Sequence, residues 1–61
     1  MNNLKLTRKS RRLTQKELAS LLHMSTSTYV KKEKNLDYFK IQEAMEIAKI
    51  LNSDINYLFK S

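Results

Sequence analysis

The chain contains no cysteine, glycine or proline in its 61 residues. Without cysteine it can form neither a disulfide nor a thiolate zinc site. The lack of glycine and proline argues against a β-rich fold, because tight hairpins depend on these residues. The single histidine has no suitably clustered carboxylates that would complete a metal site. We therefore expect no metal, no cofactor and no small-molecule ligand.

Two further classes of protein are disfavoured. No apolar run approaches the length of a membrane span, and no signal-peptide core is present. The chain has no set of nucleophile, base and orienting group, and no glycine-rich phosphate loop. We therefore expect no catalytic residue, no enzyme and no membrane partner. A soluble all-α domain over residues 1–61 remains, expected in the cytoplasm and near the lower size limit for a self-sufficient core.

The charge is positive and unevenly placed. The net charge is +6, and residues 1–36 carry nine Lys and Arg against two Glu, a net +7. Residues 37–61 carry three Lys against four acidic residues, a net −1. A basic segment favours polyanion binding, because cations near phosphates release counterions. The alternatives are a solvated surface and, more weakly, membrane attraction.

The stretch LTQKELASLLHMSTSTYVKKE, residues 13–33, predicts two short helices joined by a turn. Thr14 and Glu17 have the spacing of a capping box, and Leu18, Ala19 and Leu22 then share one helical face. Ser25 is the expected N-cap of the second helix. Such a pair is typical of a DNA-reading helix-turn-helix, although other small helical bundles also contain capped helix pairs.

Helical periodicity predicts five helices, over residues 3–12, 15–22, 26–34 and 40–51 and in a last short segment capped by Asp54. The apolar residues of these segments are expected to form the core, with Tyr29 as the inward anchor of the third helix. They are Leu4, Leu6, Leu18, Ala19, Leu22, Tyr29, Ile41, Ala44, Met45, Ile47, Ala48, Leu51, Ile55 and Leu58.

Several segments together resemble one family. They are Leu4 with Arg8, LTQKELA (13–19), MSTSTY (24–29), Glu33, IAKIL (47–51) and DINYLF (54–59). The chain resembles the Cro/repressor-type helix-turn-helix domains, also called the xenobiotic-response-element family. The resemblance implies a five-helix repressor-like bundle with the helix-turn-helix at helices 2–3, often dimeric, that binds operator DNA through its third helix. It also implies an inward ion pair between Arg8 and Glu33, and a Gln15 that contacts phosphate and supports the third helix.

The chain departs from the family pattern at its turns. His23 stands where glycine is usual, so we expect it to adopt a positive φ. Asn35 replaces the glycine after the third helix, and we expect it to be left-handed as well. Phe39 and Lys40 replace a common Pro-Ser pair, which deprives the fourth helix of a good cap. Lys32 occupies a position that is often apolar, where its stem can still cover apolar surface.

The front of the third helix is where a helix-turn-helix reads base edges. Thr26, Ser27, Val30 and Lys31 share the face opposite Tyr29 and are the candidates for base reading, although Val30 can also be a partly buried filler. Six further residues are candidates for contacts to the DNA backbone. They are Arg11, Arg12, Lys16, Thr28, Lys34 and Lys40.

The most concrete interpretation is a sequence-specific transcriptional regulator of double-stranded DNA. The resemblance and the short length together suggest a minimal Cro-like repressor of a phage or mobile element, which binds a palindromic operator as a weak homodimer. The C-terminal segment offers Tyr57 and Phe59 for the dimer interface, with core burial as the alternative for Phe59. Other readings are a protein-interaction or inhibitor module, an antitoxin or restriction–modification controller, and an RNA-binding domain.

Overall fold

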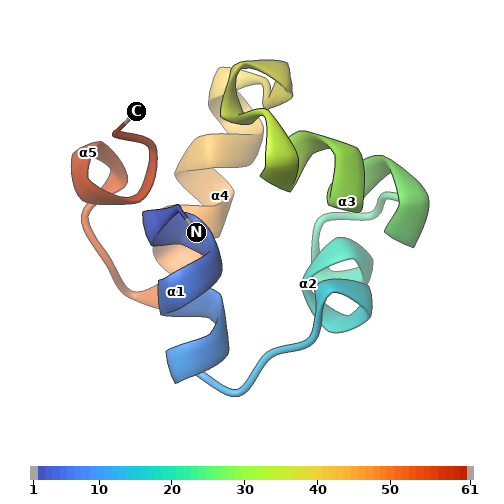
Figure 1. Cartoon of the computed structure of the whole chain (residues 1–61), viewed down its shortest axis with the longest axis horizontal. Coiled ribbons are helices and arrows are strands. Elements are labelled where there is room, and N and C mark those ends of the chain that lie inside the picture. The colour runs from blue at the N-terminus through green and yellow to red at the C-terminus, as the bar shows by residue number, and fades with distance from the viewer. Residues whose placement is uncertain (1, 61) are drawn as a thin grey trace.

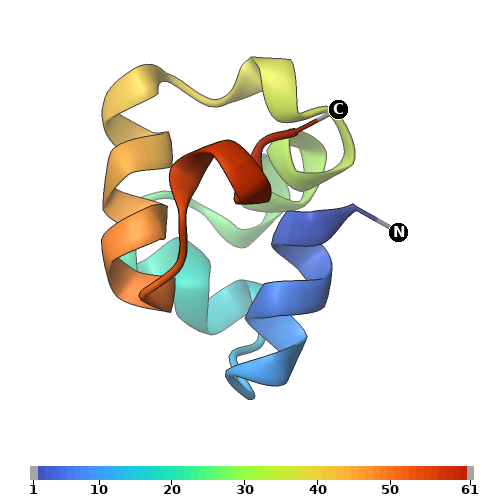
Figure 2. The ribbon, with the colours of Figure 1, turned by 90° about the vertical axis from the view of Figure 1, so that its left-hand side faces the viewer.

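The computed structural model describes residues 2–60 and is all-helical over that range, as expected. The elements are α1 (Asn3–Ser10), α2 (Gln15–Leu21), α3 (Thr26–Lys34), the 3₁₀ helix η1 (Leu36–Tyr38), α4 (Ile41–Leu51) and α5 (Ile55–Leu58). Figure 1 shows α2 and α3 together on one side of the molecule, with α1, α4 and α5 on the other. The short α5 lies between α1 and α4 and packs against both (Figure 2). The described residues contain no helix long and apolar enough to cross a membrane.

Local side-chain caps start most of the helices. The predicted capping box is present, because the Thr14 hydroxyl accepts from the Glu17 N–H at 3.0 Å and Glu17 accepts from the Thr14 N–H at 2.8 Å. Ser25 and Asp54 are the N-caps of α3 and α5, as predicted. Asn2 caps α1 in the same way. These caps satisfy N–H groups that have no partner within the helix, and they fix where each helix begins.

Three helices end without glycine in a conformation that usually uses it. Arg12, His23 and Asn52 have φ values of 60°, 59° and 49°. Each follows its helix in a Schellman arrangement; after α2, for example, the His23 N–H bonds to the Ser20 carbonyl at 3.1 Å and the Met24 N–H to the Ala19 carbonyl at 3.0 Å. The positive φ expected at His23 is therefore confirmed, and those of Arg12 and Asn52 were not anticipated.

The left-handed conformation expected at Asn35 is wrong. Asn35 is extended, with a φ of −132°, and its side chain accepts from the Asp37 N–H at 3.3 Å. Asn35 thereby caps η1, a turn of 3₁₀ helix between α3 and α4. This turn was not predicted from the sequence. The turn at Arg12 also ends α1 at Ser10, two residues earlier than expected.

The core collects one or two apolar residues from each α-helix. Its fully buried members are Leu4, Leu18, Ala19, Tyr29, Ile47, Leu51 and Leu58. Partly buried side chains pack around them, among them Leu13, Leu22, Met24, Leu36, Phe39, Ala48, Ile50 and Phe59. Because these positions come from all parts of the chain, the core fixes the helix-turn-helix on α1 and α4.

Three residues expected in the core are exposed. Leu6, Ile41 and Met45 retain 47%, 67% and 56% of their accessible surface. Leu6 lies about 200° around the helix from the buried Leu4, and Met45 has the same separation from Ile47. Ile41 is the first residue of α4 and lines a surface groove beside Phe39. Ile55 is only half-buried. The buried face of these helices is therefore narrower than the apolar face that the sequence predicts.

Candidate nucleic-acid interface

The outward face of α3 carries small polar side chains at its N-terminal end. Thr26, Ser27 and Lys31 are exposed, and Val30 is half-buried. The Thr28 hydroxyl accepts from the Ser25 hydroxyl at 2.8 Å, so this predicted backbone contact also belongs to the cap of α3. Three of the four base-reading candidates therefore lie on one accessible surface.

The opposite face of α3 is fixed inside the protein by Glu33, whose side chain is 3% exposed. Its carboxylate accepts from Arg8 Nε at 2.9 Å and Nη2 at 3.3 Å, from the Tyr29 hydroxyl at 2.6 Å and from Gln15 Nε2 at 3.0 Å. Arg8 also donates from Nη1 to the Leu13 carbonyl at 2.7 Å. One carboxylate thus joins α1, α2 and α3, and it places Arg8 and Glu33 in the contact that the sequence resemblance implied.

The protonation states in this cluster follow from its contacts. Burial alone would raise the pKa of Glu33, but the hydrogen bonds from Arg8, Tyr29 and Gln15 and the charge of Arg8 together lower it. Burial and the adjacent carboxylate raise the pKa of the Tyr29 hydroxyl, which therefore remains a donor. Every buried side-chain polar atom of the described residues, those of this cluster included, has a hydrogen-bond partner. A stable buried ion pair requires such complete pairing.

These elements, two capped helices with a positive φ between them and a second helix anchored from behind, are those of a helix-turn-helix. Residues 4–58 match the family model described as helix-turn-helix. The chain belongs to the Cro/repressor-type helix-turn-helix family. It is thus a domain of a DNA-binding family, and the family resemblance seen in its sequence is confirmed. No curated protein and no solved structure matches the chain significantly.

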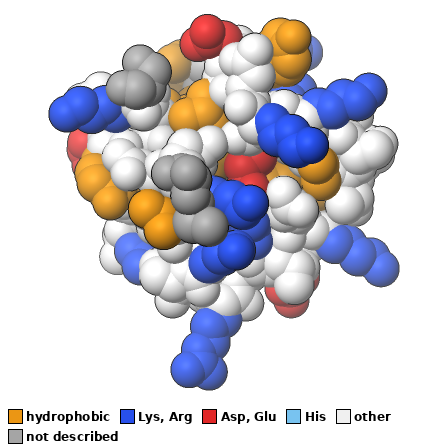
Figure 3. Space-filling model, in the orientation of Figure 1, with side chains coloured by type: hydrophobic (Ala, Val, Ile, Leu, Met, Phe, Trp, Pro, Cys, Tyr) orange, Lys and Arg blue, Asp and Glu red, His pale blue; other side chains and the backbone are white. Residues whose placement is uncertain are grey.

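In this helix-turn-helix domain the predicted backbone contacts fall into two groups. Arg12, Lys16, Lys34 and Lys40 are exposed, and Figure 3 shows Lys and Arg side chains projecting on the side of α2 and α3. Gln15 differs from them, because its amide already donates to Glu33 and supports α3 from behind. Its position at the start of α2 is also where a helix-turn-helix meets phosphate.

Arg11 has a structural bond that sequence reasoning missed. Its Nε donates to the carbonyl of Leu51 at 2.8 Å, and its Nη1 donates to the Ser10 hydroxyl at 3.2 Å. The Leu51 carbonyl belongs to the last turn of α4, where a cation is favourable. This bond spans 40 residues, and no local pattern in the sequence indicates it. Arg11 therefore ties α1 to the end of α4, which weakens its assignment as a phosphate contact.

Proposed function

We propose that this domain is a transcriptional repressor of the minimal Cro-like kind, which binds a palindromic operator as a dimer. The observation that carries the proposal is the division of α3 into two faces. Tyr29 and Glu33 hold its inward face against α1 and α2, while Thr26, Ser27 and Lys31 face outward. A recognition helix needs both a fixed position and free polar groups at the base edges.

The proposed readout assigns different roles to side chains on the same surface. Thr26 and Ser27 can donate to or accept from several bases, and the methyl group of Thr26 can contact thymine. Lys31 can reach guanine or a phosphate. Val30, half-buried, supplies apolar contact at the edge of the same face. Lys16, Lys34, Lys40 and Arg12 contact phosphates on either side and contribute affinity without sequence preference.

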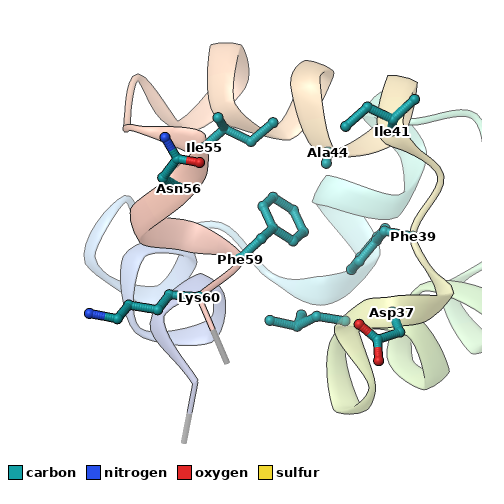
Figure 4. A pocket seen from close by; sticks show the side chains of 9 residues that line it. Asp37, Phe39, Ile41, Ala44, Ile55, Asn56, Phe59 and Lys60 are labelled. Carbon is teal, nitrogen blue, oxygen red and sulfur yellow. The ribbon is translucent and has the colours of Figure 1, made fainter.

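The dimer interface is proposed at the C-terminal segment. Tyr57 is 49% exposed, whereas Phe59 is half-buried and packs edge-on against Phe39 with ring centroids 5.6 Å apart. Figure 4 shows Phe59 beside Phe39 in a groove that Ile41 and Ile55 also line. Part of the Phe59 surface is thus already buried against the core, and Tyr57 is the stronger interface candidate. Pairing two recognition helices lets the protein read two half-sites about 34 Å apart.

The test is selection of bound sequences from random duplex DNA, followed by titration of selected and random duplexes at several salt concentrations. Replacing Lys16 with Ala should weaken binding to both duplexes and flatten the salt dependence by about one unit of slope. Replacing Thr26 or Lys31 with Ala should change the preferred base at particular positions, by about 1–3 kcal/mol.

Two results would contradict the proposal. If Lys16, Thr26 and Lys31 substitutions all reduce binding to selected and random DNA equally, the surface does not divide into base-reading and backbone-contacting residues. If the protein shows no salt-dependent binding to duplex DNA, the alternative of a protein-interaction module is favoured. A selected sequence without an inverted repeat, together with a one-to-one complex in sedimentation, would contradict the dimer.

A further inference from the structure

The end of α3 and the start of α4 are joined by one ion pair. Lys32 Nζ lies 2.8 Å from Oε1 and 3.0 Å from Oε2 of Glu43. The two side chains are 16% and 21% exposed, and Nζ is 6.0 Å from the centroid of the Phe39 ring. Among the hydrogen bonds of residues 2–60, these two connect α3 directly to α4. Lys32 therefore has a specific partner in a position that is often apolar in this family.

Glu43 is itself fixed to the start of α4. Its Oε1 accepts from the Lys40 N–H at 2.9 Å, which is one of the two bonds of a capping box; Lys40 has no side-chain acceptor to make the other. Burial would raise the pKa of Glu43, but the hydrogen bonds from Lys32 and the Lys40 N–H lower it below its ordinary value. The carboxylate is therefore charged at neutral pH and holds Lys32 at a defined point of the fold.

The ion pair adds a second attachment to a helix that already has one. Glu33 fixes α3 to α1 and α2, and the adjacent Lys32 points about 100° away around the helix, toward α4. Two attachments in different directions restrict rotation and tilt of α3 more than either one alone. Lys31, a base-reading candidate, directly precedes them. Discrimination between bases depends on such support from neighbouring residues, because small shifts loosen the contacts.

We infer that Lys32 and Glu43 are a positioning pair, which sets the orientation of α3 and thereby the discrimination between operator and random DNA. The inference rests on the proposed function. It assigns Lys32 no contact with phosphate, although Lys32 lies in the basic part of the sequence. Loss of Glu43, although it is an acidic residue in a domain of a DNA-binding family, should therefore impair recognition.

Electrostatics alone predicts the opposite effect, namely that removing the negative charge of Glu43 strengthens binding to DNA. Glu43→Gln raises the net charge from +6 to +7, which should strengthen binding to any DNA. Glutamine can still accept from the Lys40 N–H, because it also serves in capping boxes. The matched control is Glu46→Gln, which makes the same charge change on an exposed side chain of the same helix. For Lys32→Met, which keeps an apolar stem near Phe39, the control is Lys34→Met on the exposed side of α3.

The experiment measures dissociation constants of the full chain for its selected operator and for random duplex DNA at several salt concentrations. Each variant is assayed below its own melting temperature, so that a loss of folding is not counted as a loss of recognition. We expect Glu43→Gln and Lys32→Met each to reduce the operator-to-random affinity ratio about threefold or more. The double variant should reduce this ratio no further than either single variant, because both changes break the same contact. Lys32→Arg should restore most of the ratio. Both controls should keep the ratio, and only Lys34→Met should flatten the salt dependence.

Three outcomes would overturn the inference. Glu43→Gln and Glu46→Gln could give the same ratio, which would make Glu43 an ordinary surface charge. Lys32→Met could keep the ratio while flattening the salt dependence as Lys34→Met does, which would make Lys32 a phosphate contact. If the unmodified protein prefers no duplex sequence, the proposed function fails and the inference falls with it. The first two outcomes overturn the positioning role and leave the proposed function intact.

Discussion

Loss of the Glu33 carboxylate should strongly destabilise the domain. Glu33→Ala removes the acceptor of four hydrogen bonds and leaves the buried Arg8 guanidinium without its counter-charge. Breaking a buried pair from one side costs about 3–5 kcal/mol. At 0.05–0.15 kcal/mol per residue, the whole domain is stable by only about 3–9 kcal/mol. The variant should therefore lose at least about a third of the stability of the domain.

Thermal unfolding followed by circular dichroism measures this effect. A loss of 1 kcal/mol lowers the Tm of a domain of this size by about 4–8 °C, so Glu33→Ala should lower it by at least about 12 °C. Glu46→Ala is the matched control, because it removes the same charge from an exposed helical position. Its effect should stay within about 0.5 kcal/mol. Melting temperatures for the two variants within about 3 °C of each other, a difference of less than about 1 kcal/mol, would refute the account of Glu33.

Three other predictions concern pH, the turn and the dimer. The lowered pKa of Glu33 means that its contribution to stability is complete above its ordinary value of 4.5 and is lost as the pH falls further; acid titration of Glu33→Gln should show a shallower loss. His23→Gly should relieve the positive φ and raise the Tm by about 2–8 °C, whereas His23→Ala should not. Tyr57→Ala should reduce binding to two half-sites more than to one, and equal losses in a gel-shift titration would argue against a Tyr57 interface.

Features that depend on residues three or four apart were predictable from the sequence. The Thr14–Glu17 capping box and the Ser25 cap of α3 join residues three apart, and their residue types are nearly diagnostic. Tyr29, the one aromatic residue of a mostly polar helix, was predicted to face inward. These local signals were sufficient to place the two helices of the interface and to separate the inward face of α3 from the outward one.

Features that join distant parts of the chain were not predictable in the same way. The bonds from Arg11 to the Leu51 carbonyl and from Lys32 to Glu43 depend on how the helices pack, so nothing in the local sequence marks either cation as occupied. The exposure of Ile41 and Met45 also depends on how the helices pack. A domain of 61 residues cannot cover every apolar side chain of an amphipathic helix, and the pattern alone does not say which side stays open.

The structure also revises what the net charge implies for DNA binding. Ten Lys and Arg occur in residues 1–40, but Arg8, Arg11 and Lys32 have partners within the protein. The other seven are exposed or half-exposed, so they set an upper limit on phosphate contacts from this part of one protomer. At about 0.9 per phosphate, the logarithmic salt slope cannot exceed about 6 in magnitude for each protomer if these cations supply it. A steeper slope would require Arg11 or Lys32 to exchange its internal partner for phosphate. Under the proposed function, the cations with partners within the protein position the helices, and the remaining ones supply the attraction to DNA.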